Sequence, residues 1–220
     1  MKISVHQPQY LPWLGYFDKI RKSDLFVFLD NVQYKKREFQ NRNKIRTKEG
    51  WMWLTVPVIT KEKYLQKISE VETDHTAGWT DEHLKGIEFN YTKSGFFHDY
   101  HGTFKDIYSQ KWPKLIDINL SITNILLRIF GIKTPVEFES KLSVDTTSSQ
   151  RIVDICKKLN ADTYLSGAGA KDYLDVELFK ANNIKIEWQD FMHPEYKQTF
   201  EGFQPYMSII DYLFNCGTAF

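Results

Sequence analysis

Strand-like and helix-like segments alternate at both ends of this chain, and this alternation is what most constrains the fold. Residues 25–29 form a continuous apolar run rich in β-forming side chains, which is typical of a strand buried on both faces. An earlier strand-like run over residues 2–5 stops before Pro8, and residues 10–21 then carry apolar side chains at helical spacing. Strand, helix and strand in this order predict a parallel sheet.

The C-terminal third repeats the pattern. Strands are expected where short apolar runs occur, and helices where apolar residues recur every three or four positions. Such an alternation predicts an α/β fold, a Rossmann-like doubly wound and mainly parallel sheet with a helical insertion. The predicted strands of this part cover residues 138–142, 163–166 and 184–188, and the predicted helices begin at a cap on Ser148 or Ser149 or cover residues 171–181 and 208–214.

The middle of the chain is less regular. A strand is predicted over residues 51–59, after a basic hairpin that turns at Gly50, and a strongly amphipathic helix over residues 113–130. Residues 61–111 show no clear periodicity. A length of 220 residues suits one domain, residues 1–220, with a helical lid or insertion over about residues 61–131.

Composition excludes several classes of function. The net charge of +1 gives no global reason to expect a nucleic acid or an anionic membrane as partner. Two cysteines imply no disulfide framework. The chain opens directly into a strand-like run without a charged leader, and no apolar run approaches the ~20 residues that span a bilayer. We therefore predict a cytoplasmic protein without membrane insertion.

One short segment is locally basic, with only Glu38 and Glu49 opposing its positive charges. It is interpreted either as a solvated loop or edge hairpin, or as an anion-binding rim for phosphates. A nucleic-acid patch is the third interpretation, because the rest of the chain supplies no long-range attraction. The basic residues are Lys35, Lys36, Arg37, Arg42, Lys44, Arg46 and Lys48.

Ligands of open parallel sheets bind beyond the carboxyl ends of the strands. This rule selects His6, which follows the first strand, Asp30, which follows the second, and Gly167, which follows a late one. His6 is a candidate for acid–base chemistry or, alternatively, a residue that hydrogen-bonds the backbone before Pro8. We expect these three strand-end residues to face a common cavity.

The turn that begins at Gly167 has two interpretations. Its backbone N–H groups could hold an anion at the start of a helix, where Lys171 adds positive charge. The alternative is an ordinary turn between a strand and a helix. Cys156 shares an apolar helix face and is predicted to pack in the core. No metal site and no cofactor are predicted, because the histidine pairs His75 with His83 and His98 with His101 lack further ligands.

Residues 6–17, with the sequence HQPQYLPWLGYF, closely resemble the opening of WbqC-like proteins. The resemblance covers essentially the full chain. It includes Asp30 to Lys35 with Asn41 to Asn43, Tyr164 to Gly167 with Tyr173 and Leu174, and Ser208 to Asp211 with Asn215.

The resemblance implies a bacterial transferase of polysaccharide, O-antigen or related biosynthesis. Such an enzyme would attach an acyl or aminoacyl group, for example glycyl, to an amino group. The implied partners are a small-molecule substrate such as a nucleotide-linked amino sugar, and an acyl or aminoacyl carrier protein. His6 and Asp30 are the predicted catalytic residues. The predicted substrate-binding residues are Gln7, Tyr10, Trp13, Tyr16, Lys35, Asn41, Arg42, Ser166, Gly167, Lys171 and Tyr173.

Two other functions stay open. A strand ending in a His/Pro loop, then a helix and a second strand ending in Asp, is similar to Rossmann-like nucleotidylyltransferases and pantoate ligases. Those enzymes bind triphosphate with two histidines spaced three apart, whereas this chain has His6 and Gln9. The third function is a non-catalytic binding module that presents exposed aromatic residues such as Trp13 and Trp79 within a biosynthetic complex.

Overall fold

The computed structural model describes residues 1–219. The fold comprises two compact units that the chain enters alternately. Unit 1 contains residues 1–7, 15–32 and 132–192. Unit 2 contains residues 8–14 and 33–131 and the chain from residue 193 onward.

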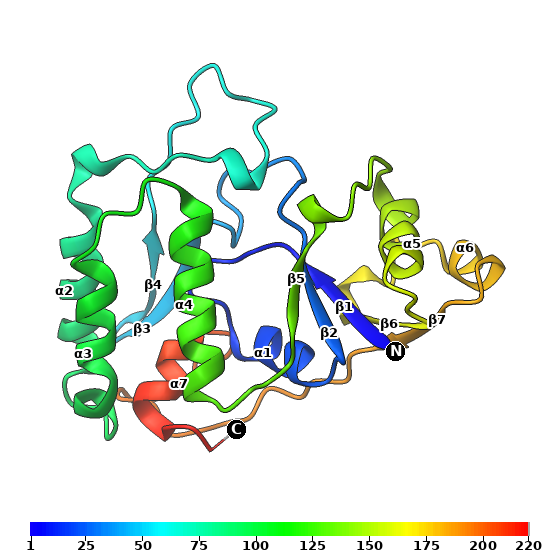
Figure 1. Ribbon diagram of the computed structural model, residues 1–220. Helices are drawn as coiled ribbons and strands as arrows, with labels where there is room; N and C mark the ends of the chain where they lie inside the picture. Colours follow the sequence, from blue (N-terminus) through cyan, green and yellow to red (C-terminus); the bar gives the residue numbers. More distant parts are fainter. Residues whose placement is uncertain (220) are drawn as a thin grey trace. The chain divides into compact units, whose positions relative to one another are not determined.

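Unit 1 is built on a five-stranded parallel sheet (Figure 1). Strands β1, β2 and β5 extend the sheet in one direction, whereas β6 and β7 extend it in the other, so the strand order reverses between β1 and β6. The order across the sheet is β5 (Val136–Phe138), β2 (Leu25–Phe28), β1 (Lys2–His6), β6 (Thr163–Ser166) and β7 (Lys185–Trp188).

Helices cover both faces of this sheet. Helix α1 (Leu14–Arg21) lies on one face. There the ring of Tyr16 packs edge-on against the ring of Phe26, with 5.4 Å between the ring centroids. Helices α5 (Ser148–Lys158) and α6 (Val176–Ala181) contribute to the core on the other face, which includes Val5 and Phe179. The α/β class and the mainly parallel sheet are therefore confirmed.

Several predicted boundaries are wrong. The helix predicted over residues 10–21 begins only at Leu14, because Leu11 has a φ of 45° and leaves the helical conformation. The helix predicted over residues 171–181 begins at Val176. There the side chain of Asp175 accepts a hydrogen bond from Leu178 N and caps the helix.

Two further predictions, the end of the strand before α5 and the residue that caps α5, also differ from the structure. The strand expected over residues 138–142 ends at Phe138, and a 3-10 turn, η3 (Glu139–Lys141), follows it. Neither expected serine caps α5, since the capping position is Thr147, whose side chain makes no capping bond. The hydroxyl of Ser149 instead accepts a hydrogen bond from Asp175 N at 3.0 Å.

Unit 2 combines a two-stranded hairpin with helices. Strands β3 (Arg42–Thr47) and β4 (Gly50–Thr55) form an antiparallel hairpin. A basic hairpin was predicted here, but the strand predicted over residues 51–59 ends at Thr55. Helix α3 packs against α2, α4 and α7. Figure 1 shows α2, α3 and α4 side by side. The helical elements are α2 (Trp79–Tyr91), α3 (Phe97–Tyr108), α4 (Leu115–Ile129), α7 (Ile209–Cys216) and the turns η1 (Ile68–Glu70) and η2 (His75–Ala77).

The amphipathic helix predicted over residues 113–130 is α4, and Gly131 follows it with a φ of 65°. Helices α2, α3 and α4 occupy the range in which a helical insertion was expected. The description of the chain as one domain with an inserted lid stays a prediction. None of the helices formed by residues 1–219 is both long and apolar enough to cross a membrane.

Candidate functional site

His6 is the last residue of β1, and its imidazole is half-buried. The ring lies edge-on to that of Tyr16, with centroids 5.0 Å apart, and Nδ1 lies 3.1 Å from Gln7 O. A carbonyl oxygen can only accept, so we assign the proton to Nδ1, which leaves Nε2 as an acceptor. Burial, together with the charge of Lys19, lowers the pKa of His6 to about 3. His6 is therefore neutral near pH 7.

Lys19 lies on the sheet-facing side of α1, next to His6. Its side chain is buried, and Nζ donates to Val5 O over 3.4 Å. The carboxylate of Asp18 pairs with Lys22 instead, and Lys19 forms no ion pair within the described residues. Burial lowers the pKa of Lys19 to about 7. This amine can therefore exchange a proton at neutral pH.

Sequence reasoning missed Lys19, although a signal was present. Tyr16, Ile20 and Ser23 are buried at spacings of three and four residues, and Lys19 falls on the same helix face. A lysine at such a position is expected to extend its ammonium group to water, but here the amine stays inside unit 1.

The carbonyl oxygen of Gln7 accepts hydrogen bonds from two other side chains of the N-terminal motif. It accepts hydrogen bonds from His6 Nδ1 at 3.1 Å and from the hydroxyl of Tyr16 at 3.2 Å. Burial raises the pKa of Tyr16 well above its usual value, so the hydroxyl keeps its proton. The backbone directly after β1 is thus held in place by two side chains.

Asp30 follows β2 and is buried. Its two carboxylate oxygens accept hydrogen bonds from Ser140 N at 2.9 Å and from Ser140 Oγ at 2.7 Å. These bonds fix the turn η3 at the end of β5. The partner of His6 Nδ1 is Gln7 and those of Asp30 are on Ser140, so within the described residues the carboxylate does not orient the imidazole by a direct hydrogen bond.

Ser166 ends β6, the neighbour of β1 on the side where the strand order reverses. It is buried, and its hydroxyl lies 3.4 Å from Gly167 O. Gly167 has an extended conformation (φ −66°, ψ 147°). A Cβ at Gly167 or Gly169 would meet no atom within 4 Å, so neither position requires glycine for steric reasons.

The segment after Gly167 is a 3-10 turn, η4 (Ala168–Ala170), and not the first turn of α6. Ala170 N donates to Gly167 O, and Lys171 N to Ala168 O. Lys171 and Tyr173 are exposed beyond the turn, and Lys171 Nζ lies 5.7 Å from the ring centroid of Trp188. An anion held here would rely on Lys171 rather than on a helix N-terminus.

The remaining predicted site residues belong to unit 2. Tyr10 is buried, and its hydroxyl hydrogen-bonds His83 Nδ1 at 2.8 Å and the hydroxyl of Tyr108 at 2.5 Å. The ring of Trp13 stacks on His193 with an angle of 6° between the planes. Trp79, which was expected to be an exposed aromatic, is only 2% exposed. That expectation is wrong, because its ring packs against His83 and Tyr108.

The basic segment divides into structural and exposed parts. Arg46 is buried and donates to backbone carbonyls, including those of Gly50 and Gly202. Arg42 and Lys44 stack over the tryptophans of β4, with Arg42 Cζ 4.1 Å from the Trp53 ring centroid. The side chain of Lys35 is exposed. Within the described residues none of the seven basic side chains forms an ion pair, so the exposed ones are available to anions.

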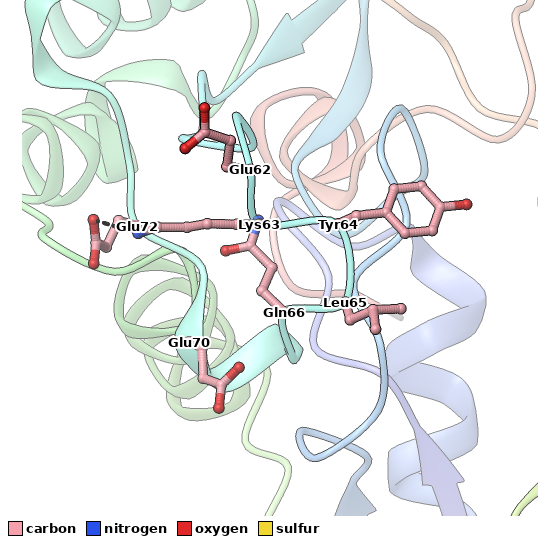
Figure 2. A pocket seen from close by; sticks show the side chains of 7 residues that line it. All are labelled: Glu62, Lys63, Tyr64, Leu65, Gln66, Glu70 and Glu72. Carbon is pink, nitrogen blue, oxygen red and sulfur yellow. Dashed lines mark ion pairs between the residues drawn. The ribbon is translucent and has the colours of Figure 1, made fainter.

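Three surface hollows lie on unit 2. One, of about 640 Å³, is lined by side chains of residues 62–72, where Lys63 pairs with Glu72 at 3.0 Å (Figure 2). The second, of about 500 Å³, is lined by residues 195–203, and the third, of about 340 Å³, by side chains of α3 and α4. None of the three is lined by a strand-end residue of unit 1, and the common cavity stays a prediction.

The two cysteines form no disulfide with each other. Cys156 is buried in the core of unit 1, as predicted, and burial raises the pKa of its thiol to about 12. Both cysteines are free thiols. Residues 1–219 contain no group of three or more His, Cys, Asp or Glu side chains arranged to hold a metal ion.

The fold is therefore that of an α/β protein whose parallel sheet reverses its strand order between β1 and β6, with His6 and Ser166 at the ends of these strands. The chain belongs to the WbqC-like protein family, whose sequence model matches residues 7–219.

A relative of similar length comes from Mycobacterium tuberculosis (strain ATCC 25618 / H37Rv). The chain is 35% identical over 218 residues to this protein, which is named "Uncharacterized protein Rv1507c". The match covers 98% of this chain and 94% of that protein. No solved structure shows a significant match.

Proposed function

We propose that this protein transfers an acyl or aminoacyl group to the amino group of a small molecule in polysaccharide, O-antigen or related biosynthesis. The supporting observation is the position of His6-Gln7 and Ser166-Gly167, which lie at the carboxyl ends of two neighbouring strands where the strand order reverses. Open parallel sheets bind their ligands at this point. On the same ground we describe the sheet as Rossmann-like.

In the proposed reaction an amine attacks the carbonyl carbon of a thioester. The N–C bond forms, the C–S bond breaks, and the thiol leaves while the attacking nitrogen loses a proton. His6, neutral and with a free acceptor at Nε2, holds the amine by a hydrogen bond. Lys19, whose pKa is about 7, is the group that takes up the proton at neutral pH.

Other residues have supporting roles in this proposal. Asp30 fixes the end of the sheet through Ser140. In unit 2 the exposed Lys35 and the half-buried Arg42 and Lys44 are the predicted cations available to a phosphate group.

A steady-state assay with a nucleotide-linked amino sugar and an aminoacyl carrier protein tests the proposal. We expect Lys19→Met to lower kcat about 100-fold or more, the usual contribution of a proton-transfer group. His6→Ala, which removes the hydrogen bond that holds the amine, should also lower turnover. Lys180→Met, which changes an exposed lysine of α6, is the matched control and should retain full turnover. Unchanged turnover of His6→Ala would remove His6 from the mechanism.

Nucleotidyl transfer is a second candidate function. The strand order of unit 1, with its reversal next to the first strand, is also that of sheets that bind nucleotides. Calorimetric titration with nucleoside triphosphates distinguishes the two. Tight binding that requires magnesium would favour nucleotidyl transfer over acyl transfer.

A binding module without catalysis is the third candidate. Residues 8–12, directly after His6-Gln7, are buried, and none of the three hollows described above opens at them. A protein without turnover on any amine or thioester, which nevertheless joins a stable complex with biosynthetic enzymes, would favour this function.

A further inference from the structure

Buried polar atoms without a hydrogen-bond partner are concentrated in one part of unit 2. Buried polar groups in folded proteins are nearly always paired, so each exception requires an explanation. Five of the eight such side-chain atoms within the described residues lie around a single loop, which makes a shared explanation necessary. They are Gln9 Oε1, Tyr34 Oη, Asn41 Oδ1, Arg42 Nε and Asn119 Oδ1.

Hydrogen bonds to Phe39 and Gln40 bring these residues together. Tyr10 N, next to Gln9, donates to Phe39 O at 3.0 Å. Lys35 N, next to Tyr34, donates to Gln40 Oε1 at 3.0 Å. Segments that are distant in the sequence thus meet at one short stretch of backbone.

The other three residues meet at the same place. Asn119, on α4, donates from Nδ2 to Gln40 O at 2.8 Å. Asn41 and Arg42 follow Gln40 directly in the chain, and the charge of Arg42 acts on the hydroxyl of Tyr34. The five residues with unpaired atoms therefore lie within residues 34–42 or are joined to this loop by these hydrogen bonds.

The chemistry of the unpaired atoms is defined by their neighbours. Asn41 Nδ2 donates to Val56 O at 2.9 Å, and Asn119 Nδ2 donates to Gln40 O. Carbonyl oxygens accept and cannot donate, so in both amides the unpaired end is the oxygen. With Gln9 Oε1 the group offers three acceptors. Arg42 Nε–H is a donor, and the hydroxyl of Tyr34 can also donate.

A ligand that pairs with all five atoms must supply three donors and an acceptor of negative charge. An ammonium group carries three N–H donors, and a carboxylate accepts from a guanidinium and a hydroxyl together. We infer that the loop formed by residues 34–42, with Gln9 and Asn119, binds the head group of a free α-amino acid. A phosphate ion carries at most two O–H donors near neutral pH and could not pair with all three acceptors.

This inference goes beyond the transfer reaction and does not rest on it. Binding itself requires no turnover. A protein that binds an amino acid but transfers nothing would contradict the proposed function and leave this site intact.

The test begins with the melting temperature of the full-length protein in the presence of each of the 20 standard amino acids. At least one should raise it. Calorimetry then compares that amino acid with two fragments, acetate and methylammonium, each of which matches half of the site. The complete amino acid should bind at least tenfold more tightly than either fragment. No stabilisation by any amino acid, or equal affinity of a fragment, would overturn the inference.

Tyr34→Phe is the sharpest variant, because it removes only an unpaired hydroxyl. The protein without ligand should be as stable as the wild type or more stable, since no hydrogen bond is lost. Amino-acid affinity should fall about tenfold or more, the usual effect of losing a hydrogen bond to a charged group. Tyr64→Phe, at a tyrosine that is 84% exposed, is the matched control.

Unchanged amino-acid affinity in Tyr34→Phe would contradict the inference. So would a crystal structure of the protein with the amino acid in which only ordered water contacts Asn41 and Asn119. Retained transfer activity in a variant that has lost amino-acid binding would leave the transfer reaction standing and remove this site from it.

Discussion

The amine nitrogen of Lys19 lies 3.4 Å from the carbonyl oxygen of Val5, the residue that precedes His6 on the central strand. Within the described residues this amine forms no ion pair with a carboxylate. A positive charge buried in this way is unfavourable, and it also disfavours a second positive charge on the adjacent imidazole. The pair therefore controls how unit 1 responds to pH.

The free energy of unfolding should increase with pH on the alkaline side. The pKa of Lys19 is about 7 in the folded protein and near 10.5 in the unfolded chain, so between these values the unfolded chain binds the additional proton. Stability therefore rises with pH, by roughly 4 kcal/mol from pH 7 to pH 10. Denaturant unfolding at several pH values measures this, and Lys19→Met should flatten the slope. An equal slope in both proteins would contradict the burial of the charge.

The imidazole of His6 should remain neutral at pH 5, with its proton on Nδ1. Burial is the larger cause of its low pKa and the charge of Lys19 the second, so Lys19→Met should raise the pKa of His6 only in part. Nitrogen-15 NMR of the imidazole reports both the tautomer and the pKa. A wild-type His6 that titrates near 6.5 would show that the ring is solvated.

Tyr10→Phe should destabilise the protein by roughly 1 to 3 kcal/mol. The substitution removes the hydroxyl that bonds His83 Nδ1 and Tyr108 and leaves a buried imidazole nitrogen unpaired. Thermal or denaturant unfolding measures the loss, and Tyr64→Phe at the exposed loop provides the control, with a change within about 0.5 kcal/mol. Equal stability of the two variants would show that the buried hydroxyl is not needed.

Arg151→Met should cost roughly 3 to 5 kcal/mol, because it leaves a buried carboxylate without its cation. Glu139 is fully buried, and its Oε1 lies 3.1 Å from Arg151 Nη1. Adding Glu139→Gln to Arg151→Met should restore most of the loss, since the double variant buries no unpaired charge. Purely additive effects of the two substitutions would exclude this coupling.

The sheet of unit 1 could be predicted from the sequence because its strands are short apolar runs that need only burial on both faces. The strands around residues 25–29, 163–166 and 184–188 follow from composition and turn residues alone. Helix α4 was equally clear, because its apolar residues form a continuous stripe facing the core.

Helix α2 could not be predicted, because its polar and apolar residues are partly exchanged between surface and core. Phe89 is 87% exposed, whereas His83 and Asn90 are buried. Their burial depends on partners that are distant in the sequence or on the helix backbone, such as Tyr10 for His83 and Gly86 O for Asn90. A pattern that sorts residues by hydropathy cannot anticipate such pairs.

The candidate site could be predicted only in part, because contacts between residues that are distant in the sequence also determine it. The rule that ligands bind at strand ends selected His6 and Asp30. The structure places His6 as the last residue of β1 and Asp30 two residues after the end of the neighbouring parallel strand β2. The rule could not show that Asp30 bonds to Ser140, because that contact depends on the position of β5. The unpaired polar atoms near residues 34–42 could not be predicted from the sequence either, since they depend on tertiary hydrogen bonds.

The central claim is that a ligand binds beyond the carboxyl ends of β1 and β6. The most direct measurement is an amide NMR titration of the isotope-labelled protein with a nucleotide-linked amino sugar. We predict that the largest changes in chemical shift within unit 1 occur at His6, Gln7, Ser166 and Gly167, and that they saturate with a single affinity. Saturable binding that leaves these four amides unchanged would contradict the claim.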